Sequence, residues 1–175
     1  MIILAVLMTV SVNSQHLKFM GIPIDGNINR FSAKMSAKGF SISPINRYTG
    51  PGQRVMRGTF FDQPAEIWIN YNISTKIVYS VRVQFFSEDS DVCGSFMKEI
   101  KKVIEDKYMF LPDTGKTKGG DDIDIYHIFN EEMILVGDIY IGISQATDYF
   151  GYHLNLTYED LENKEKNDTK KNNDI

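Results

Sequence analysis

The sequence is short of the residues that build disulfides and metal sites. It contains one cysteine, Cys93, so no disulfide can form within the chain. Its three histidines, His16, His127 and His153, stand far apart, and no two of them have the spacing of a metal-ligand pair. We therefore predict no metal site, and nothing in the sequence indicates a cofactor. An unpaired thiol can be reactive or can join two chains, but Cys93 adjoins apolar helix positions, which favours a small buried hydrophobe.

A strong charge of either sign is also missing. The chain has 19 basic and 23 acidic residues, for a net charge of −4. A nucleic-acid-binding domain normally shows a basic stripe, and this sequence has none. The sequence thus predicts no nucleic-acid partner.

No apolar run reaches the roughly 20 residues that span a bilayer. The longest, Met1–Val12, has the length of the hydrophobic part of a secretory leader, and small residues follow it at Ser14. We predict a signal peptide over residues 1–14, export to the periplasm or the extracellular space, and no membrane span after cleavage. No Lys or Arg precedes the run, which is atypical, and a buried N-terminal strand or helix is the alternative.

What is present is the composition of a folded domain, with 42% hydrophobic and 12% aromatic residues. Two segments have helical spacing. In the first, Asn27 can cap a helix that carries Ile28, Phe31 and Met35 on one side and ends at Gly39. The second begins at Ser90 or Asp91. Its predicted apolar stripe is Val92, Phe96, Ile100, Val103 and Ile104, and its predicted solvent side is Lys98, Lys101, Lys102 and Glu105.

Strict alternation of apolar and polar residues predicts half-buried strands elsewhere. It is clearest over residues 65–72 and 75–86, and three more strands are predicted over residues 123–129, 133–144 and 152–160. Residues 40–58 are expected to be strand interrupted by loop, and residues 111–122 a polar loop. The predicted buried sides include Ile77, Tyr79, Val81, Val83 and Phe85, then Ile139, Ile141 and Ile143, and finally Leu154, Leu156 and Tyr158.

The order of these elements predicts the fold class. Runs of strands separated by single helices favour an α+β domain, mainly an antiparallel sheet with two helices on one face, in the order β-α-βn-α-β3. We assign residues 15–162 to this single domain. Residues 163–175 contain no apolar residue before Ile175 and are expected to form a disordered polar tail.

An ordered set of short motifs carries a resemblance. The stretches KFMGIPIDG, RGTF, VYSVRVQF, EDKY and LNLTYEDLEN occur in that order. Together they resemble a group of small exported proteins of gut bacteria, known only as hypothetical proteins, over residues 16–163. The helix start SDVCGSF departs from that group in lacking an aromatic residue, as does Met109, where a Gly is usual. The resemblance implies export and this architecture, and it brings no biochemical activity.

Three motif-like stretches lack the context that their chemistry needs. Leu111–Gly115 reads LPDTG, the pentapeptide cleaved by sortases, but no membrane-spanning segment and basic end follow it. Gly115-Lys116-Thr117 lacks the upstream glycine of a P-loop. Asp121, Asp122 and Asp124 do not have the spacing of a calcium loop, and a solvated turn is the better interpretation.

The sheet face away from the helices is the candidate binding surface. Amphipathic aromatic residues and Arg are enriched at interaction surfaces. Ordinary cross-strand pairing is the alternative, and so is a face covered by the N-terminal strand or by residues 40–58. The residues predicted on this face are Trp68, Arg82, Gln84, Tyr126, Tyr140 and His153.

No catalytic set is apparent, so a non-catalytic role is favoured over an enzyme. We predict an exported binding module that uses this face to hold a protein, peptide or glycan, with its ligand and oligomeric state left open. The alternative is a small secreted hydrolase, or an inhibitor of one, with a site in the loops around residues 50–58 and 111–122.

Overall fold

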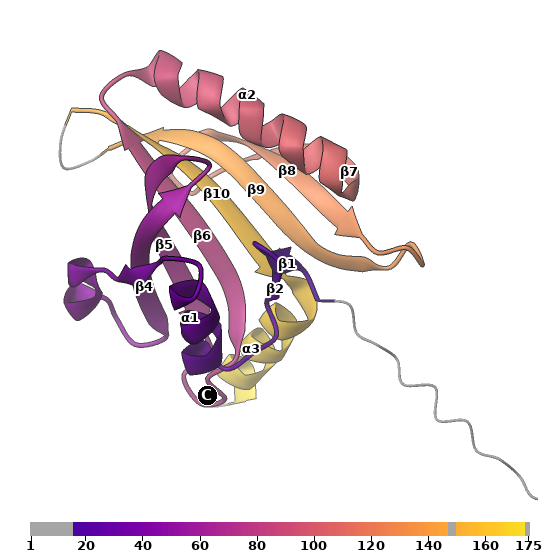
Figure 1. Cartoon of the computed structure of the whole chain (residues 1–175). Coiled ribbons are helices and arrows are strands. Elements are labelled where there is room, and N and C mark those ends of the chain that lie inside the picture. The colour runs from indigo at the N-terminus through magenta and orange to yellow at the C-terminus, as the bar shows by residue number, and fades with distance from the viewer. Residues whose placement is uncertain (1–15, 147–149, 174–175) are drawn as a thin grey trace, which may run out of the picture.

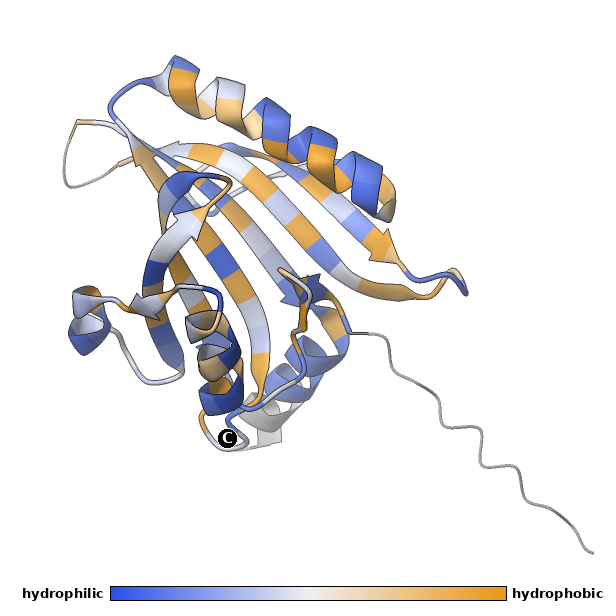
Figure 2. Cartoon of the chain, viewed as in Figure 1, coloured by the Kyte–Doolittle hydropathy of each residue, from blue (hydrophilic) through white to orange (hydrophobic). Residues whose placement is uncertain are grey.

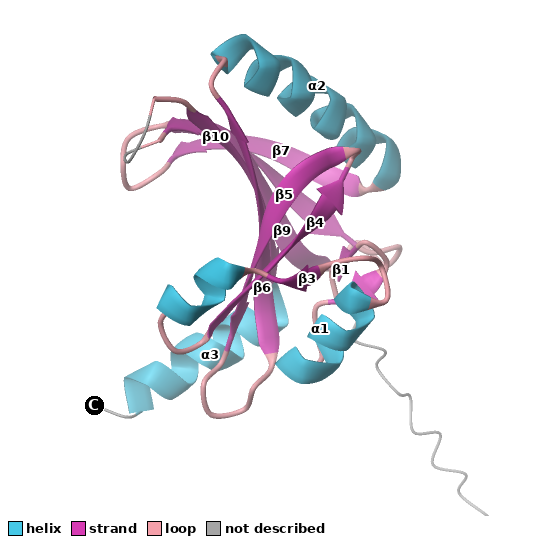
Figure 3. Ribbon diagram, turned by 60° about the vertical axis from the view of Figure 1, so that its left-hand side comes forward, coloured by secondary structure: helices cyan, strands magenta, loops and turns pink. Residues whose placement is uncertain are grey.

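The chain folds into an eight-stranded antiparallel sheet with helices on both of its faces (Figures 1 and 3). The computed structural model describes residues 16–146 and 150–173. The predicted signal peptide, residues 1–14, lies outside the described residues. Within the described part of the chain, no helix is long and apolar enough to cross a membrane.

The sheet strands and the other elements have the following bounds. The sheet contains β3 (Ser41–Ile42), β4 (Gln53–Phe60), β5 (Gln63–Tyr71), β6 (Val78–Ser87), β7 (Met109–Lys116), β8 (Asp122–Phe129), β9 (Leu135–Gln145) and β10 (Tyr152–Asp160). Outside it are the hairpin β1 (Lys18–Phe19) and β2 (Ile22–Pro23), the helices α1 (Ile28–Ser36), α2 (Ser90–Lys107) and α3 (Leu161–Asn173), and the 3-10 helix η1 (Pro44–Tyr48).

The strand order is β3-β4-β5-β6-β10-β9-β8-β7. Each half of the sheet therefore consists of one helix followed by four strands, α1 with β3 to β6 and α2 with β7 to β10. The last strand of each half, β6 and β10, meet at the centre as an antiparallel pair. The α+β class and the antiparallel sheet are confirmed, whereas the predicted count of two helices and three final strands is too low.

One sheet face carries the hydrophobic core. Val81, Ile141 and Leu156 are fully buried on this face, beneath α1, α2 and the β1–β2 hairpin. The hairpin contributes Phe19, whose ring stacks on Phe60 with centroids 5.5 Å apart. The alternation along the central strands is visible as bands of opposite hydropathy in Figure 2. The period of two thus places the core side of β9 and β10 as the sequence predicts.

Helix α1 follows its sequence signals closely. The Asn27 side chain accepts a hydrogen bond from the Asn29 backbone N–H at 2.9 Å, which caps the first turn. Phe31 and Met35 are buried as predicted. Gly39 follows the helix with a φ of +92°, a left-handed conformation that glycine adopts without steric cost.

Helix α2 is rotated slightly from the predicted stripe. Cys93, Ile100 and Ile104 are its buried residues, whereas Val92 and Val103 are exposed. Burial is the main cause of a raised pKa for the Cys93 thiol, as expected for a small buried hydrophobe rather than a nucleophile.

Strand β7 corrects the predicted loop over residues 111–122. Leu111–Gly115 lies inside this edge strand, which pairs only with β8 among the described strands. Pro112 has no N–H to give to a ladder, so an edge position is where a strand tolerates it. The Asp113 side chain accepts from the Thr114 backbone N–H at 2.7 Å. Pro and Asp, which indicate a loop in the sequence, here occupy the free edge that such residues protect from further strand pairing.

Helix α3 differs from the predicted disordered tail. The structure continues as a helix through Asn173, although the segment is almost wholly polar. Hydrogen bonds rather than apolar contacts attach it. The Asn163 side chain donates to the Ile24 carbonyl at 2.8 Å, and Asn167 accepts from Asn72 at 2.9 Å. Composition alone does not reveal these partners, because Ile24 lies 139 residues from Asn163 and Asn72 lies 95 residues from Asn167 along the chain.

Candidate functional site

The sheet face opposite α1 and α2, here called the second face, holds five of the six predicted site residues. Trp68 on β5 is the cross-strand partner of Arg82 on β6, and Arg82 is in turn opposite Thr157 on β10. Thr157 is opposite Tyr140 on β9. Trp68, Arg82 and Tyr140 therefore lie in one row across four adjacent strands, Gln84 lies in the next row, and His153 lies in the row beyond that.

Tyr126 does not belong to this face. It is buried on the helix side, where its hydroxyl donates to the Glu105 carboxylate of α2 at 3.2 Å. The prediction was wrong because β8 carries apolar residues on both of its sides. Tyr126 and Ile128 face the core, while Ile123 and Ile125 face the other way. Alternation cannot orient a strand whose two sides are both apolar.

Trp68 and Arg82 form a stacked pair. The Arg82 guanidinium carbon lies 5.2 Å from the centroid of the Trp68 ring, within the range of a cation–π interaction. Trp68 Nε1 and Arg82 Nε are both buried without a hydrogen-bond partner among the described residues. His153 Nδ1 is the third such atom. In the part of the chain that the structure describes, the three buried polar side-chain atoms that lack a partner therefore all belong to predicted site residues on the second face.

The Arg82 charge is not neutralised within the described part of the chain. Desolvation by burial lowers the pKa of its guanidinium, and no neighbouring carboxylate opposes that effect. None of the ion pairs among residues 16–146 and 150–173 involves Arg82. A partly buried cation without a counter-ion is unfavourable for folding, and such groups concentrate at functional sites.

A short polar ladder lies in the next row. Gln84 donates its side-chain amide to Asn155 at 3.1 Å, and the Asn155 amide donates to the Ser144 hydroxyl at 3.2 Å. These side chains are positioned by one another across β6, β10 and β9. Gln84 is thus part of the predicted site, and its amide is already engaged in holding Asn155.

Tyr140 is held by acidic neighbours. Its hydroxyl donates to Asp138 at 3.0 Å, and Asp138 also contacts His127 Nδ1 at 2.7 Å. Burial, followed by the nearby charges of Glu159 and Asp138, raises the pKa of the Tyr140 phenol well above its usual value. The phenol therefore stays protonated at neutral pH and acts as a hydrogen-bond donor, not as a base.

His153 lies toward the other end of the second face. Its ring centroid is 5.6 Å from that of Phe86, its cross-strand partner. It stands four positions before Thr157 on β10, which corresponds to about 13 Å along a strand. The structure therefore does not bring His153 together with Arg82 and Tyr140 in one contact group.

A pocket of about 320 Å³ opens beside Arg82. Its walls come from β6, β9, β10, the start of β8 and the turn between β7 and β8, which supplies Thr117 and Asp121. Gly142 permits this arrangement, because a Cβ there would lie 2.7 Å from Ile123 Cγ2 and 2.9 Å from the Asp122 carbonyl. The polar side chains lining it are Arg82, Thr117, Asp121, Tyr140, Ser144, Asn155 and Thr157.

Other elements cover the ends of the second face. Helix α3 crosses one end, where Lys164 pairs with Glu159, on the side of the sheet away from α1 (Figure 3). Helix η1 lies at the β4 end, where Asn46 Oδ1 accepts from the Val55 backbone N–H at 2.9 Å. The alternative that residues 40–58 fold over this face is thus correct for its β4 end. The N-terminal hairpin packs on the core side instead.

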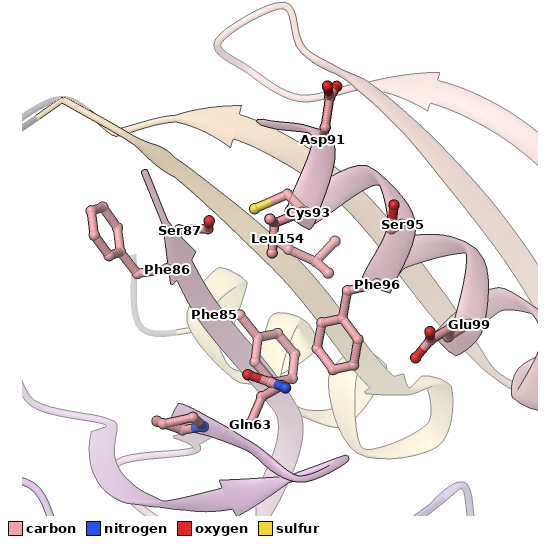
Figure 4. A pocket seen from close by; sticks show the side chains of 12 residues that line it. Gln63, Phe85, Phe86, Ser87, Asp91, Cys93, Ser95, Phe96, Glu99 and Leu154 are labelled. Carbon is pink, nitrogen blue, oxygen red and sulfur yellow. The ribbon is translucent and has the colours of Figure 1, made fainter. Parts of the chain in front are cut away.

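A second and larger pocket, of about 660 Å³, lies between α2 and the ends of β6 and β10. Figure 4 shows Phe85 and Phe96 side by side at this pocket, with Cys93 and Leu154 above them in the view. The rings of Phe85 and Phe96 meet edge to face with centroids 4.8 Å apart. Its lining is mostly apolar, and it contains none of the three buried polar atoms that lack a partner.

Neither pocket presents a metal centre or a catalytic set. Within residues 16–146 and 150–173, no group of three or more His, Cys, Asp or Glu is arranged to hold a metal ion. The aspartates near the β7–β8 turn bind different partners: Asp121 accepts from Thr117, Asp122 pairs with Lys116, and Asp124 pairs with Lys101. The His127–Asp138 pair resembles a catalytic dyad in its 2.7 Å contact, but Cys93 lies on the opposite face of the sheet.

The sequence interpretation missed the residues that turn this face into a pocket. Asn155 and Thr157 alternate with Leu154 and Leu156, so the period of two already placed them on the second face. The β7–β8 turn gave no such signal, because its position over the sheet depends on how the hairpin folds back. No protein-family model, curated protein or solved structure matches this chain.

Proposed function

We propose that this protein is an exported, non-catalytic binding module that holds its ligand on the second face of the sheet, at the pocket beside Arg82. The observation that carries this proposal is the concentration on the second face of Trp68 Nε1, Arg82 Nε and His153 Nδ1, the buried polar side-chain atoms without partners in the described chain; of the three residues, Arg82 lines the pocket. Native proteins satisfy most buried polar groups, so such atoms mark positions that a ligand or ordered water completes.

The surroundings of Arg82 support binding rather than chemistry. Tyr140 is locked as a donor by Asp138, and Gln84 and Asn155 hold each other in fixed orientations. Pre-positioned donors and acceptors around a small pocket give orientation and specificity to a ligand. None of the residues lining the pocket is a Cys or a His, the side chains that most often act as nucleophile or general base near neutral pH.

The alternative of a hydrolase or its inhibitor receives no specific support. Its predicted site is in loops around residues 50–58 and 111–122. Residues 53–58 and 111–116 lie in strands β4 and β7, and the β7–β8 turn that remains contributes Thr117 and Asp121 to the pocket beside Arg82. Export rests on the leader-like residues 1–14 and on the resemblance to small exported proteins, and the site itself does not depend on it.

Matched alanine variants test the proposal. A library of small metabolites, glycans and short peptides is screened against the full mature chain by thermal shift, and each ligand found is titrated against Trp68→Ala, Tyr140→Ala and Phe96→Ala. Phe96 lines the apolar pocket beside α2 and serves as the control. We expect ligands to lose affinity for the two second-face variants and to keep it for Phe96→Ala. Ligands that bind both second-face variants as tightly as the original chain would contradict the proposal.

A further inference from the structure

The ligand chemistry can be narrowed from the charges around the pocket, given the proposed function above. Arg82 brings the positive charge, and its guanidinium makes no hydrogen bond to any described residue. Trp68 stacks on the guanidinium. An Arg stacked on an aromatic ring keeps its N–H groups in the plane, where a planar anion can bind to two of them at once.

Asp121 brings a negative charge to the same pocket. One carboxylate oxygen, Oδ2, accepts from the Thr117 hydroxyl at 3.2 Å, and the Thr117 hydroxyl also accepts from the Asp121 backbone N–H at 3.1 Å. The other oxygen, Oδ1, makes no hydrogen bond within the described chain. It remains available to a hydrogen-bond donor or a cation on a ligand.

We propose that this pocket binds a small carboxylate that also carries an amino or hydroxyl group, with the carboxylate on Arg82 and the donor group on Asp121. Thr157, Thr117 and Asn155 line the same pocket as these two side chains. The pocket volume of about 320 Å³ is at the small end of ligand sites, which suits an amino acid or a hydroxy acid more than a polymer.

The balance of charges argues against two other ligand classes. One Arg and one Asp give the pocket no net formal charge, so a phosphate dianion would meet Asp121 without a second cation to offset it. A purely apolar ligand would leave the Arg82 guanidinium buried and unpaired, which is costly. The apolar pocket beside α2 is better suited to such a molecule.

Trp68 makes the site directly observable. It is the only tryptophan in the sequence, and it contacts the guanidinium that we assign to the ligand. Titrations of the mature chain with lactate, glycine and β-alanine are followed by tryptophan fluorescence and by calorimetry. Lactamide, glycinamide and inorganic phosphate are the matched probes, because the two amides keep the donor group and lose the carboxylate.

We expect at least one of these carboxylates to bind saturably, and its amide and phosphate to bind about tenfold more weakly or not at all. Arg82→Met should weaken carboxylate binding about tenfold or more, and Arg82→Lys should recover only part of it, because Lys lacks the planar fork. Asp121→Asn should reduce the preference for lactate over propionate while leaving propionate binding unchanged.

Three outcomes would overturn the inference: equal binding of acid and amide, unchanged binding by Arg82→Met with a native melting curve, or no binding by any of the three acids. The same experiments test the proposed function separately from the carboxylate assignment. If uncharged glycans or peptides bind and depend on Trp68 and Tyr140, the second face remains the site and only the carboxylate assignment fails. If ligands depend on Phe96 instead, both fail together.

Discussion

The two faces of the sheet are built from the same strands, but their buried side chains differ in how burial is compensated. On β9, Ile141 faces the core and is fully buried among apolar side chains, while its neighbour Tyr140 faces the other side beside two carboxylates. On the core face, burial is compensated by apolar contact. On the second face, buried polar atoms of Trp68, Arg82 and His153 have no partner in the described chain.

The difference separates stability from function within one sheet. Apolar burial favours folding in proportion to the area removed from water. An unpartnered buried polar atom opposes folding by about 1–3 kcal/mol. A face that accumulates such atoms is therefore retained for a reason other than stability, and this is the argument for placing the ligand there.

The largest expected effect on stability comes from truncating a core side chain, and the neighbouring residue on the second face provides the comparison. Ile141→Ala should lower the free energy of unfolding by about 2–5 kcal/mol, because it leaves a cavity under α2 and the hairpin. Tyr140→Phe, one residue away, should cost about 1 kcal/mol for its bond to Asp138. Urea denaturation of both variants measures the contrast.

Equal losses in the two variants would remove the distinction between the faces. A small effect of Ile141→Ala alone would mean that the core relaxes around the smaller side chain and fills the cavity. The comparison requires both variants to unfold in a single transition with unchanged steepness.

The core face was predictable because its signal is local. A period of two along β6, β9 and β10 places Val81, Ile141 and Leu156 on one side without knowledge of the partner strands. The same rule failed for Tyr126, because β8 has apolar residues on both sides. It also missed β7, since Pro112 and Gly115 in a free edge resemble a loop.

The candidate site was only partly predictable because it is assembled across the sheet. Sequence alternation placed Trp68, Arg82 and Tyr140 on one face, and the structure puts them in one row. What makes that row a pocket is the β7–β8 turn with Asp121, which folds back over strands that follow it in the chain. No short-range pattern in the sequence reports such an approach.

An intermediate effect is expected where α3 attaches. Asn163→Ala removes the amide that donates to the Ile24 carbonyl and leaves that buried acceptor unsatisfied. The free energy of unfolding should fall by about 1–3 kcal/mol. Lys166→Ala, on the exposed side of the same helix, should change it by less than about 0.5 kcal/mol. If the two substitutions have the same effect, α3 is not held by Asn163, and the second face is more open than the structure shows.

The smallest expected effect has the opposite sign and comes from comparing an arginine on β4 with one on β6, two strands separated by β5. Arg54 faces the core side and donates to Ser32 at 3.0 Å and to Asn29 at 3.1 Å, so Arg54→Met should destabilise the chain by about 1–2 kcal/mol. Arg82 has no such partners among the described residues, and Arg82→Met exchanges an unpaired, partly buried cation for an apolar side chain of similar length. It should leave stability unchanged or raise it by about 1 kcal/mol while weakening ligand binding. Urea denaturation without ligand measures the stability of both variants. The free protein should tolerate the loss of a residue that is kept for a ligand. Destabilisation of similar size in the two variants would therefore show that Arg82 stabilises the fold.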